Sequence, residues 1–168
     1  METQFEIYSY LEKKHYVEYY RYIWRKRIPV AILFAVLGIV LLALHLLTDS
    51  YHLFTGIWSV LYAIFLYFRP WMVAAKTIKQ ETKFDGTEMV ESVTKFGDEI
   101  QDASKHLSMT APYDKIEDIH FSEYTIVIKD SRKNYLILDK NGFTKGTFEE
   151  FLLFIQEKCP QLNLPKWQ

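Results

Sequence analysis

Two long apolar segments stand close together in the first half of the chain. The first, Ile28–Leu47, has 20 residues and no formal charge, and as a helix it spans about the 30 Å of a bilayer core. The second, Tyr51–Phe68, supplies 18 residues and follows directly after Thr48–Ser50. Neither segment has the charged face of a helix that packs on a soluble core. We therefore predict a transmembrane hairpin over residues 28–68, with antiparallel helices at 28–47 and 51–68.

Basic and aromatic residues flank this hairpin on both sides, whereas the turn inside it offers only Asp49. By the positive-inside rule, the asymmetry predicts a multi-pass membrane protein with both termini in the cytoplasm. Aromatic rings and cations at headgroup level are typical anchors in the membrane interface. The predicted anchors are Trp24, Arg25, Lys26, Arg27, Arg69 and Trp71.

The segment ahead of the hairpin, residues 1–27, is expected to hold a strand and a juxtamembrane helix. Phe5–Tyr8 is a short β-like stretch, and Ser9–Glu12 fits the S-x-x-E capping box of a helix N-terminus. We predict a helix that begins near Tyr10 and continues into the membrane. Pro29 removes one backbone hydrogen bond on this path, which predicts a kink at the membrane boundary.

After a second juxtamembrane helix at residues 69–83, the pattern changes to short stretches of β-forming residues separated by turn signals. The clearest pair, Tyr124–Lys129 and Tyr135–Leu138, is joined by the polar run Asp130–Asn134. It predicts a hairpin with apolar residues on both faces. The other predicted strands are Thr87–Phe96, Glu99–His106, Leu107–Ala111 and Ile116–Phe121.

A C-terminal helix follows the strands. Thr147–Glu150 is a second capping box, and Pro160 ends the helix that it opens. Apolar residues recur there at helical spacing, which predicts that the neighbouring sheet covers them. They are Phe148, Phe151, Leu152 and Ile155. Antiparallel strands closed by such a helix predict a PH-like half-barrel. The expected fold is an α+β membrane protein with a cytoplasmic PH-like domain at residues 84–160 and a tail at 161–168.

Composition and motifs exclude several classes of function. A net charge of -1 argues against a general nucleic-acid binder. A single cysteine, Cys159, excludes an intramolecular disulfide framework, and we expect a packed thiol. Ser92–Lys95 matches S-x-x-K, but it lies in a β-like stretch rather than at a helix start. An interfacial enzyme would have to recruit Asp114, His120 or Glu123, whose spacing does not require that role. We predict a non-enzymatic protein without a cofactor.

Two further groups of polar residues are weak candidates for binding. His45, Asp49 and His52 surround the predicted outer turn, but no fourth ligand is evident, so we favour residues of a wet interface over a divalent-metal site. Four cations of the tail are candidates for a rim that contacts lipid headgroups or a protein partner, with a solvated mixed surface as the favoured interpretation. They are Arg132, Lys133, Lys140 and Lys145.

Two stretches of the tail carry a resemblance to a known family. Ala111–Ile116 is similar to the family's aromatic-x-x-Ile step between strands. Tyr135–Phe143, running into Thr147–Phe151, is similar to its strand, basic-x-x-Phe turn and closing helix. On these motifs the chain resembles the YcxB-like bacterial membrane proteins over nearly its whole length. The resemblance implies two membrane spans and a PH-like C-terminal domain, and it implies no activity and no functional residue.

Together these features favour a membrane protein whose hairpin anchors a PH-like module that binds a protein partner or lipid headgroups, with an immunity or stress role as a subordinate hypothesis. The alternative is a small transport or channel-associated subunit. Gly38 and Gly56 would permit close helix packing and a homo-oligomer. Against transport, the ionisable residues of the two spans are His45 and His52 near the outer end.

Overall fold

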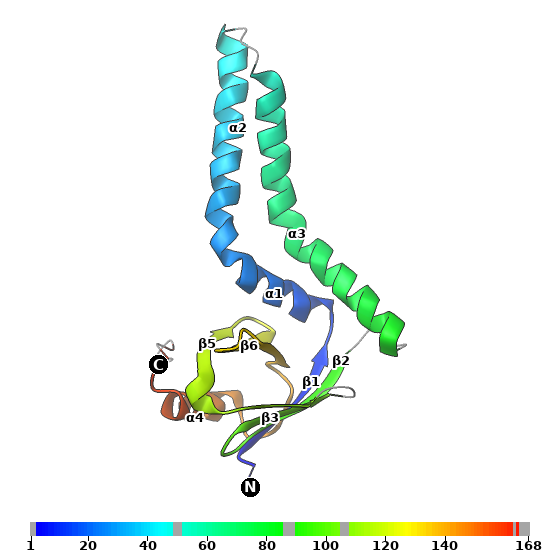
Figure 1. Cartoon of the computed structure of the whole chain (residues 1–168), viewed down its shortest axis with the longest axis vertical. Coiled ribbons are helices and arrows are strands. Elements are labelled where there is room, and N and C mark those ends of the chain that lie inside the picture. Colours follow the sequence, from blue (N-terminus) through cyan, green and yellow to red (C-terminus); the bar gives the residue numbers. More distant parts are fainter. Residues whose placement is uncertain (1–2, 49–51, 86–89, 105–107, 163, 165–168) are drawn as a thin grey trace. The chain divides into compact units, whose positions relative to one another are not determined.

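The computed structural model describes residues 3–48, 52–85, 90–104, 108–162 and 164, and its elements are labelled in Figure 1. The chain divides into two compact units. One comprises Met1–Tyr19 and Thr77–Gln168, and the other comprises Tyr20–Lys76. The first unit holds the strands and the C-terminal helix, and the second holds two long helices. The predicted α+β class is therefore confirmed.

The larger sheet has five strands in the order β4-β3-β2-β1-β8, and all neighbours are antiparallel. The strands are β1 (Phe5–Leu11), β2 (Val90–Phe96), β3 (Ile100–Ser104), β4 (Ser108–Ala111) and β8 (Phe143–Lys145). β1 lies between β2 and β8. The first segment of the chain is thus an inner strand of a sheet whose other strands all come after the long helices.

β1 is longer than predicted, and the capping box assigned to Ser9–Glu12 is wrong. The strand pairs with β2 along its full length, from Phe5 opposite Phe96 to Leu11 opposite Val90. Its alternate residues, Ser9 included, are buried. α1 (Lys13–Trp24) begins only after this strand. Seven ladder pairs outweigh a single helix cap, which contributes about 1 kcal/mol.

The smaller sheet consists of β5 (Ile116–Phe121), β6 (Thr125–Asp130) and β7 (Tyr135–Asp139), with β6 in the middle. It confirms the predicted hairpin, and Ile126, Val127 and Ile128 are consecutive and buried, so both faces of β6 are covered. A 3-10 turn, η2 (Tyr113–Lys115), precedes β5. Among the described residues the predicted ends differ by one residue: β3 and β6 begin one residue later than predicted, and β6 and β7 end one residue later. Residues 87–89 and 105–107 of the predicted strands lie outside the described residues.

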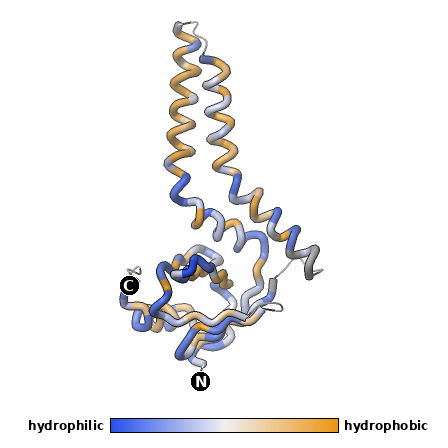
Figure 2. The backbone as a smooth tube through the Cα atoms, in the orientation of Figure 1, coloured by the Kyte–Doolittle hydropathy of each residue, from blue (hydrophilic) through white to orange (hydrophobic). Residues whose placement is uncertain are grey.

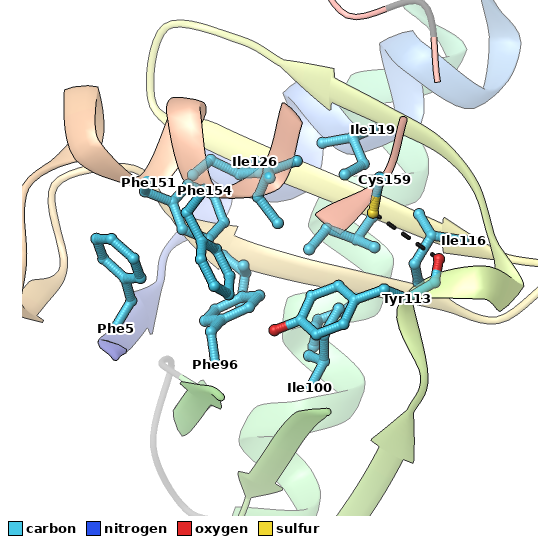
Figure 3. Packing of buried hydrophobic residues seen from close by; sticks show 14 of the residues in the cluster. Phe5, Phe96, Ile100, Tyr113, Ile116, Ile119, Ile126, Phe151, Phe154 and Cys159 are labelled. Atoms are coloured by element: carbon cyan, nitrogen blue, oxygen red, sulfur yellow. Dashed lines mark hydrogen bonds between the residues drawn. The ribbon is translucent and has the colours of Figure 1, made fainter. Parts of the chain in front are cut away.

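α4 (Phe148–Lys158) closes the core of this unit, and its predicted capping box is confirmed. The Thr147 hydroxyl accepts from the Glu150 N–H (3.3 Å), and the Glu150 carboxylate accepts from the Thr147 N–H (3.0 Å). Phe151 points into the core, with its ring centroid 4.8 Å from that of Phe96 and 5.7 Å from that of Phe5. Figure 3 shows Phe151 and Phe154 grouped with these two rings. Both sheets and α4 therefore share one hydrophobic core.

The second unit is built on η1 (Arg25–Arg27), α2 (Ile28–Thr48) and the greater part of α3 (Leu53–Asp85). η1 is a 3-10 turn just ahead of Pro29, where the sequence predicted a kink. α3 continues through Pro70, so the predicted second span and second juxtamembrane helix are parts of one helix. α2 and α3 approach closely at two glycines, because a Cβ atom on Gly38 would lie 3.0 Å from the Gly56 carbonyl oxygen.

Two helical segments, Lys13–Thr48 and Leu53–Gln80, are long and apolar enough to cross a membrane by length and composition. Figure 2 shows hydrophobic residues along almost the whole of α2 and along much of α3. Many of their large apolar side chains are exposed, such as Leu33 (65%), Ile39 (63%) and Phe54 (72%).

Candidate functional site

Three arginines of the helical unit lie over tryptophan rings. The Arg69 guanidinium is 4.4 Å from the centroid of the Trp24 ring, and the Arg27 guanidinium is 5.6 Å from the same ring. The Arg21 guanidinium is 4.3 Å from the Trp71 ring. Each such cation–π contact contributes about 0.5–2 kcal/mol, depending on its exposure to water. Since Arg69 and Trp71 belong to α3 while Arg21 and Trp24 belong to α1, these contacts join the two helices.

A pocket of about 680 Å³ lies against the same rings. We call it the hairpin pocket; it is lined by Arg21, Trp24, Arg27, Ile28, Ala31, Ile32, Ala35, Ala63, Ile64, Leu66, Tyr67, Phe68, Pro70 and Trp71. Along α2 the lining residues follow helical spacing from Ile28 to Ala35, a wall about 10 Å long at 1.5 Å per residue. Ile28, Ile32 and Ile64 are 57%, 58% and 48% exposed. The pocket therefore opens on the lateral surface of the hairpin.

The hairpin pocket belongs to a part of the chain that is rich in cations. Residues 20–76 carry six lysines and arginines, and their single acidic residue is Asp49. Within the described residues, Arg21, Arg27 and Arg69 have aromatic partners and form no salt bridge with a carboxylate. The pocket thus combines an apolar wall with a cationic end.

The structure brings together four of the six predicted anchors: Trp24, Arg27, Arg69 and Trp71. The other two predicted anchors lie outside this group. Arg25 lies over the Tyr22 ring (4.4 Å), and Lys26 is exposed. Arg21, a cation of the same basic flank, joins this group. It precedes Trp24 by three residues and shares a helix face with it.

The four cations proposed for a basic rim do not form one patch. Arg132 and Lys133 lie in the turn between β6 and β7, and Lys133 has a left-handed backbone (φ 65°). Lys140 follows the opposite end of β7, where its ammonium lies 4.5 Å from the centroid of the Phe148 ring. Lys145 donates to the Thr3 carbonyl. The length of the β6–β7 hairpin separates the two ends of the proposed rim.

A buried histidine that the sequence analysis missed lies at the start of α1. His15 is 1% exposed, and its Nδ1 accepts the Glu12 N–H at 2.9 Å. Among the described residues its Nε2 has no hydrogen-bond partner, and it is 3.6 Å from the Asp139 carboxylate, too far for a hydrogen bond. Burial lowers the pKa of His15. The signal available in the sequence was its position three residues after Glu12, where a side chain can return to the N-cap N–H.

Two predictions about reactive side chains remain: the weak metal-site candidate around Asp49, and the packed thiol of Cys159. Asp49 lies outside the described residues, and among those that are described no group of three or more His, Cys, Asp or Glu side chains could hold a metal ion. Cys159 is fully buried, and its thiol donates to the Tyr113 carbonyl at 3.8 Å. Burial raises the pKa of this thiol to about 11. The predicted packed thiol is confirmed.

Comparisons with protein families, with curated proteins and with solved structures return no match to this chain.

Proposed function

We propose that this chain is a non-enzymatic, YcxB-like integral protein of the bacterial inner membrane, in which α2 and α3 cross the bilayer and anchor a cytoplasmic PH-like module that binds a protein partner or lipid headgroups. The observation that carries this proposal is the exposure of the apolar helices. In their most apolar 18-residue windows only 6% and 22% of the residues are buried. A core helix of a soluble protein would bury most of that surface, and water would oppose its exposure.

The pairing of β1 with β2 supports the same location for both flanks of the hairpin. β1 precedes the two apolar helices and β2 follows them, yet both belong to one sheet. A chain that enters a membrane from this sheet must return to the side from which it started. The basic flanks then favour the cytoplasmic side.

The architecture of the strand-bearing unit supports a PH-like module. Two antiparallel sheets of five and three strands pack around one core, and a C-terminal helix covers it. Among the described residues of this unit, the most exposed large apolar side chain is Leu153 (68%), on the outer face of α4. This face is the first place at which to look for a partner.

Topology is the first prediction to test, and it requires engineered cysteines because Cys159 is buried. In a Cys159→Ala background, Ser131→Cys places a thiol at an exposed turn of the module. Ser50→Cys places one in the predicted outer turn. We expect a membrane-impermeant maleimide to label Ser50→Cys in intact cells and Ser131→Cys only after permeabilisation. Labelling of Ser131→Cys in intact cells, or release of the protein from membranes by alkaline carbonate, would overturn the proposal.

The binding role is tested by photo-crosslinking in native membranes. A photoreactive residue replaces Leu153, and the matched control replaces the exposed Ser131. A protein or lipid adduct specific to position 153 is the expected result. Equal adducts at both positions, or none, would contradict a binding surface on α4.

A further inference from the structure

We propose that the hairpin pocket binds an anionic phospholipid of the inner leaflet, with an acyl chain along its apolar wall and the phosphate at the two arginines that line it, Arg21 and Arg27. This inference rests on the proposed membrane insertion of the hairpin. It goes beyond it by assigning the lipid site to the helical unit, and not to the surface of the PH-like module.

The apolar wall has the dimensions and surface for part of an acyl chain. Three of the lining residues, Ala31, Ala35 and Ala63, are small, and the space that they leave is part of a volume of about 680 Å³. The neighbouring isoleucines are half exposed and line the opening. A hydrocarbon chain in this pocket would cover apolar surface that the protein itself leaves uncovered.

The arginines are oriented without losing their hydrogen-bond donors. The Arg21 guanidinium lies 4.3 Å from the Trp71 ring centroid and that of Arg27 lies 5.6 Å from the Trp24 ring centroid. An aromatic ring interacts with the cation through its π-face, whereas the five N–H groups of a guanidinium lie in its own plane. Those donors match the oxygens of a phosphate. The two tryptophans thus hold the cations in place for a ligand of this chemistry.

Net charge favours an anionic lipid over a zwitterionic one. The cations of the hairpin pocket have no carboxylate partner among the described residues, and the sequence from residue 20 to residue 76 contains one acid. A zwitterionic lipid would bring its own ammonium group close to these arginines. An anionic headgroup brings a phosphate without that opposing charge.

The test uses the full-length chain in vesicles and lets Trp24 and Trp71 report on the pocket. Trp58→Phe with Trp167→Phe leaves these two as the fluorescent reporters, and a bromine atom on a lipid acyl chain quenches a tryptophan that it contacts. Equal small fractions of brominated phosphatidylglycerol or brominated phosphatidylcholine are added to phosphatidylcholine vesicles. We expect several-fold stronger quenching by brominated phosphatidylglycerol.

Two variants of equal charge separate a site from general attraction. Arg21→Gln with Arg27→Gln should abolish the preference for phosphatidylglycerol. The matched control, Lys26→Gln with Lys76→Gln, removes the same charge from residues that do not line the pocket, and the preference should remain. Equal loss in both variants, or no preference in the parent, would overturn the proposal. Trp24 and Trp71 shielded from both brominated lipids would also overturn it and would point to a second protein chain as the occupant.

A second tryptophan reporter distinguishes failure of the lipid-site proposal from failure of the proposed membrane insertion. Trp24→Phe, Trp71→Phe and Trp167→Phe leave Trp58, which is 57% exposed on α3. Brominated phosphatidylcholine should quench Trp58 if the hairpin is inserted in the bilayer. Quenching of Trp58 without a phosphatidylglycerol preference at the pocket would reject the lipid site alone. Unquenched Trp58 would reject membrane insertion.

Discussion

His15 is a buried titratable side chain whose proton is fixed by its contacts. Because Nδ1 accepts the Glu12 N–H, the proton of the neutral ring is on Nε2. Burial lowers the pKa of this imidazole and outweighs the Asp139 carboxylate, which raises it. Lys14 lowers the pKa further, and Glu12 and Glu18 raise it. The folded state therefore favours the neutral form of His15.

This environment makes the free energy of unfolding depend on pH. The pKa of His15 is lower in the folded than in the unfolded state, so the unfolded state binds more protons and stability falls as the pH drops below about 6.5. His15→Gln keeps an acceptor for the Glu12 N–H and cannot titrate. We expect its urea midpoint to fall less than that of the wild type between about pH 7.5 and about pH 5.5.

Near-UV circular dichroism of the detergent-solubilised protein measures the urea unfolding transition at each pH. Both proteins contain the same carboxylates, so the comparison isolates the effect of His15. An identical pH dependence of His15→Gln and wild type would contradict the prediction.

α4 shows what a local sequence pattern is able to specify. Its capping box and apolar stripe lie within one helix, and the structure confirms both. The S-x-x-E pattern at Ser9–Glu12 is equally local, but there a strand partner from residues 90–96 decides the outcome. β8 was not predicted at all, because its three residues are a strand only through pairing with β1.

The candidate site, like the strands, depends on contacts between distant segments. Trp24, Arg69 and Trp71 could be recognised singly as interfacial residues from their positions beside apolar segments. Which arginine lies over which ring depends on how α3 aligns with α1, and no local pattern in the sequence encodes that alignment.

Two residues of α4 give a matched test of its packing. Phe151 is fully buried among Phe5, Phe96 and Phe143, whereas Leu153 is 68% exposed. Phe151→Ala should lower the free energy of unfolding by about 3–5 kcal/mol, because it removes buried ring contacts and leaves a cavity. Leu153→Ala should change it by less than about 0.5 kcal/mol. Urea unfolding measures both, and equal effects would show that α4 does not close the core.

The strand-bearing unit is assembled from two distant parts of the chain. The sequence predicted a PH-like domain at residues 84–160, with residues 1–27 as a separate segment. In the structure β1 is an inner strand of the larger sheet, and Ile7 within it is fully buried. Residues 77–168 alone therefore lack part of their own core.

A shortened protein that lacks residues 20–76 tests this organisation. Residues 1–19 joined to residues 77–168 by a flexible Gly/Ser linker should fold into a soluble unit, because both parts of the sheet are present. Residues 77–168 without the first segment should stay unfolded. Dispersion of amide signals in NMR spectra distinguishes the two states. A well-dispersed spectrum from residues 77–168 alone would contradict the prediction.

The pairing of Leu11 with Val90 also has a consequence for biosynthesis. β1 leaves the ribosome early and has no partner until both long helices have been made. In the proposed topology, a nascent chain with only one inserted helix would leave β1 and β2 on opposite sides of the membrane, and its sheet could not form. Such chains would expose unpaired strands to proteases and to aggregation. Completion of the sheet would thus act as a checkpoint that only correctly inserted molecules pass.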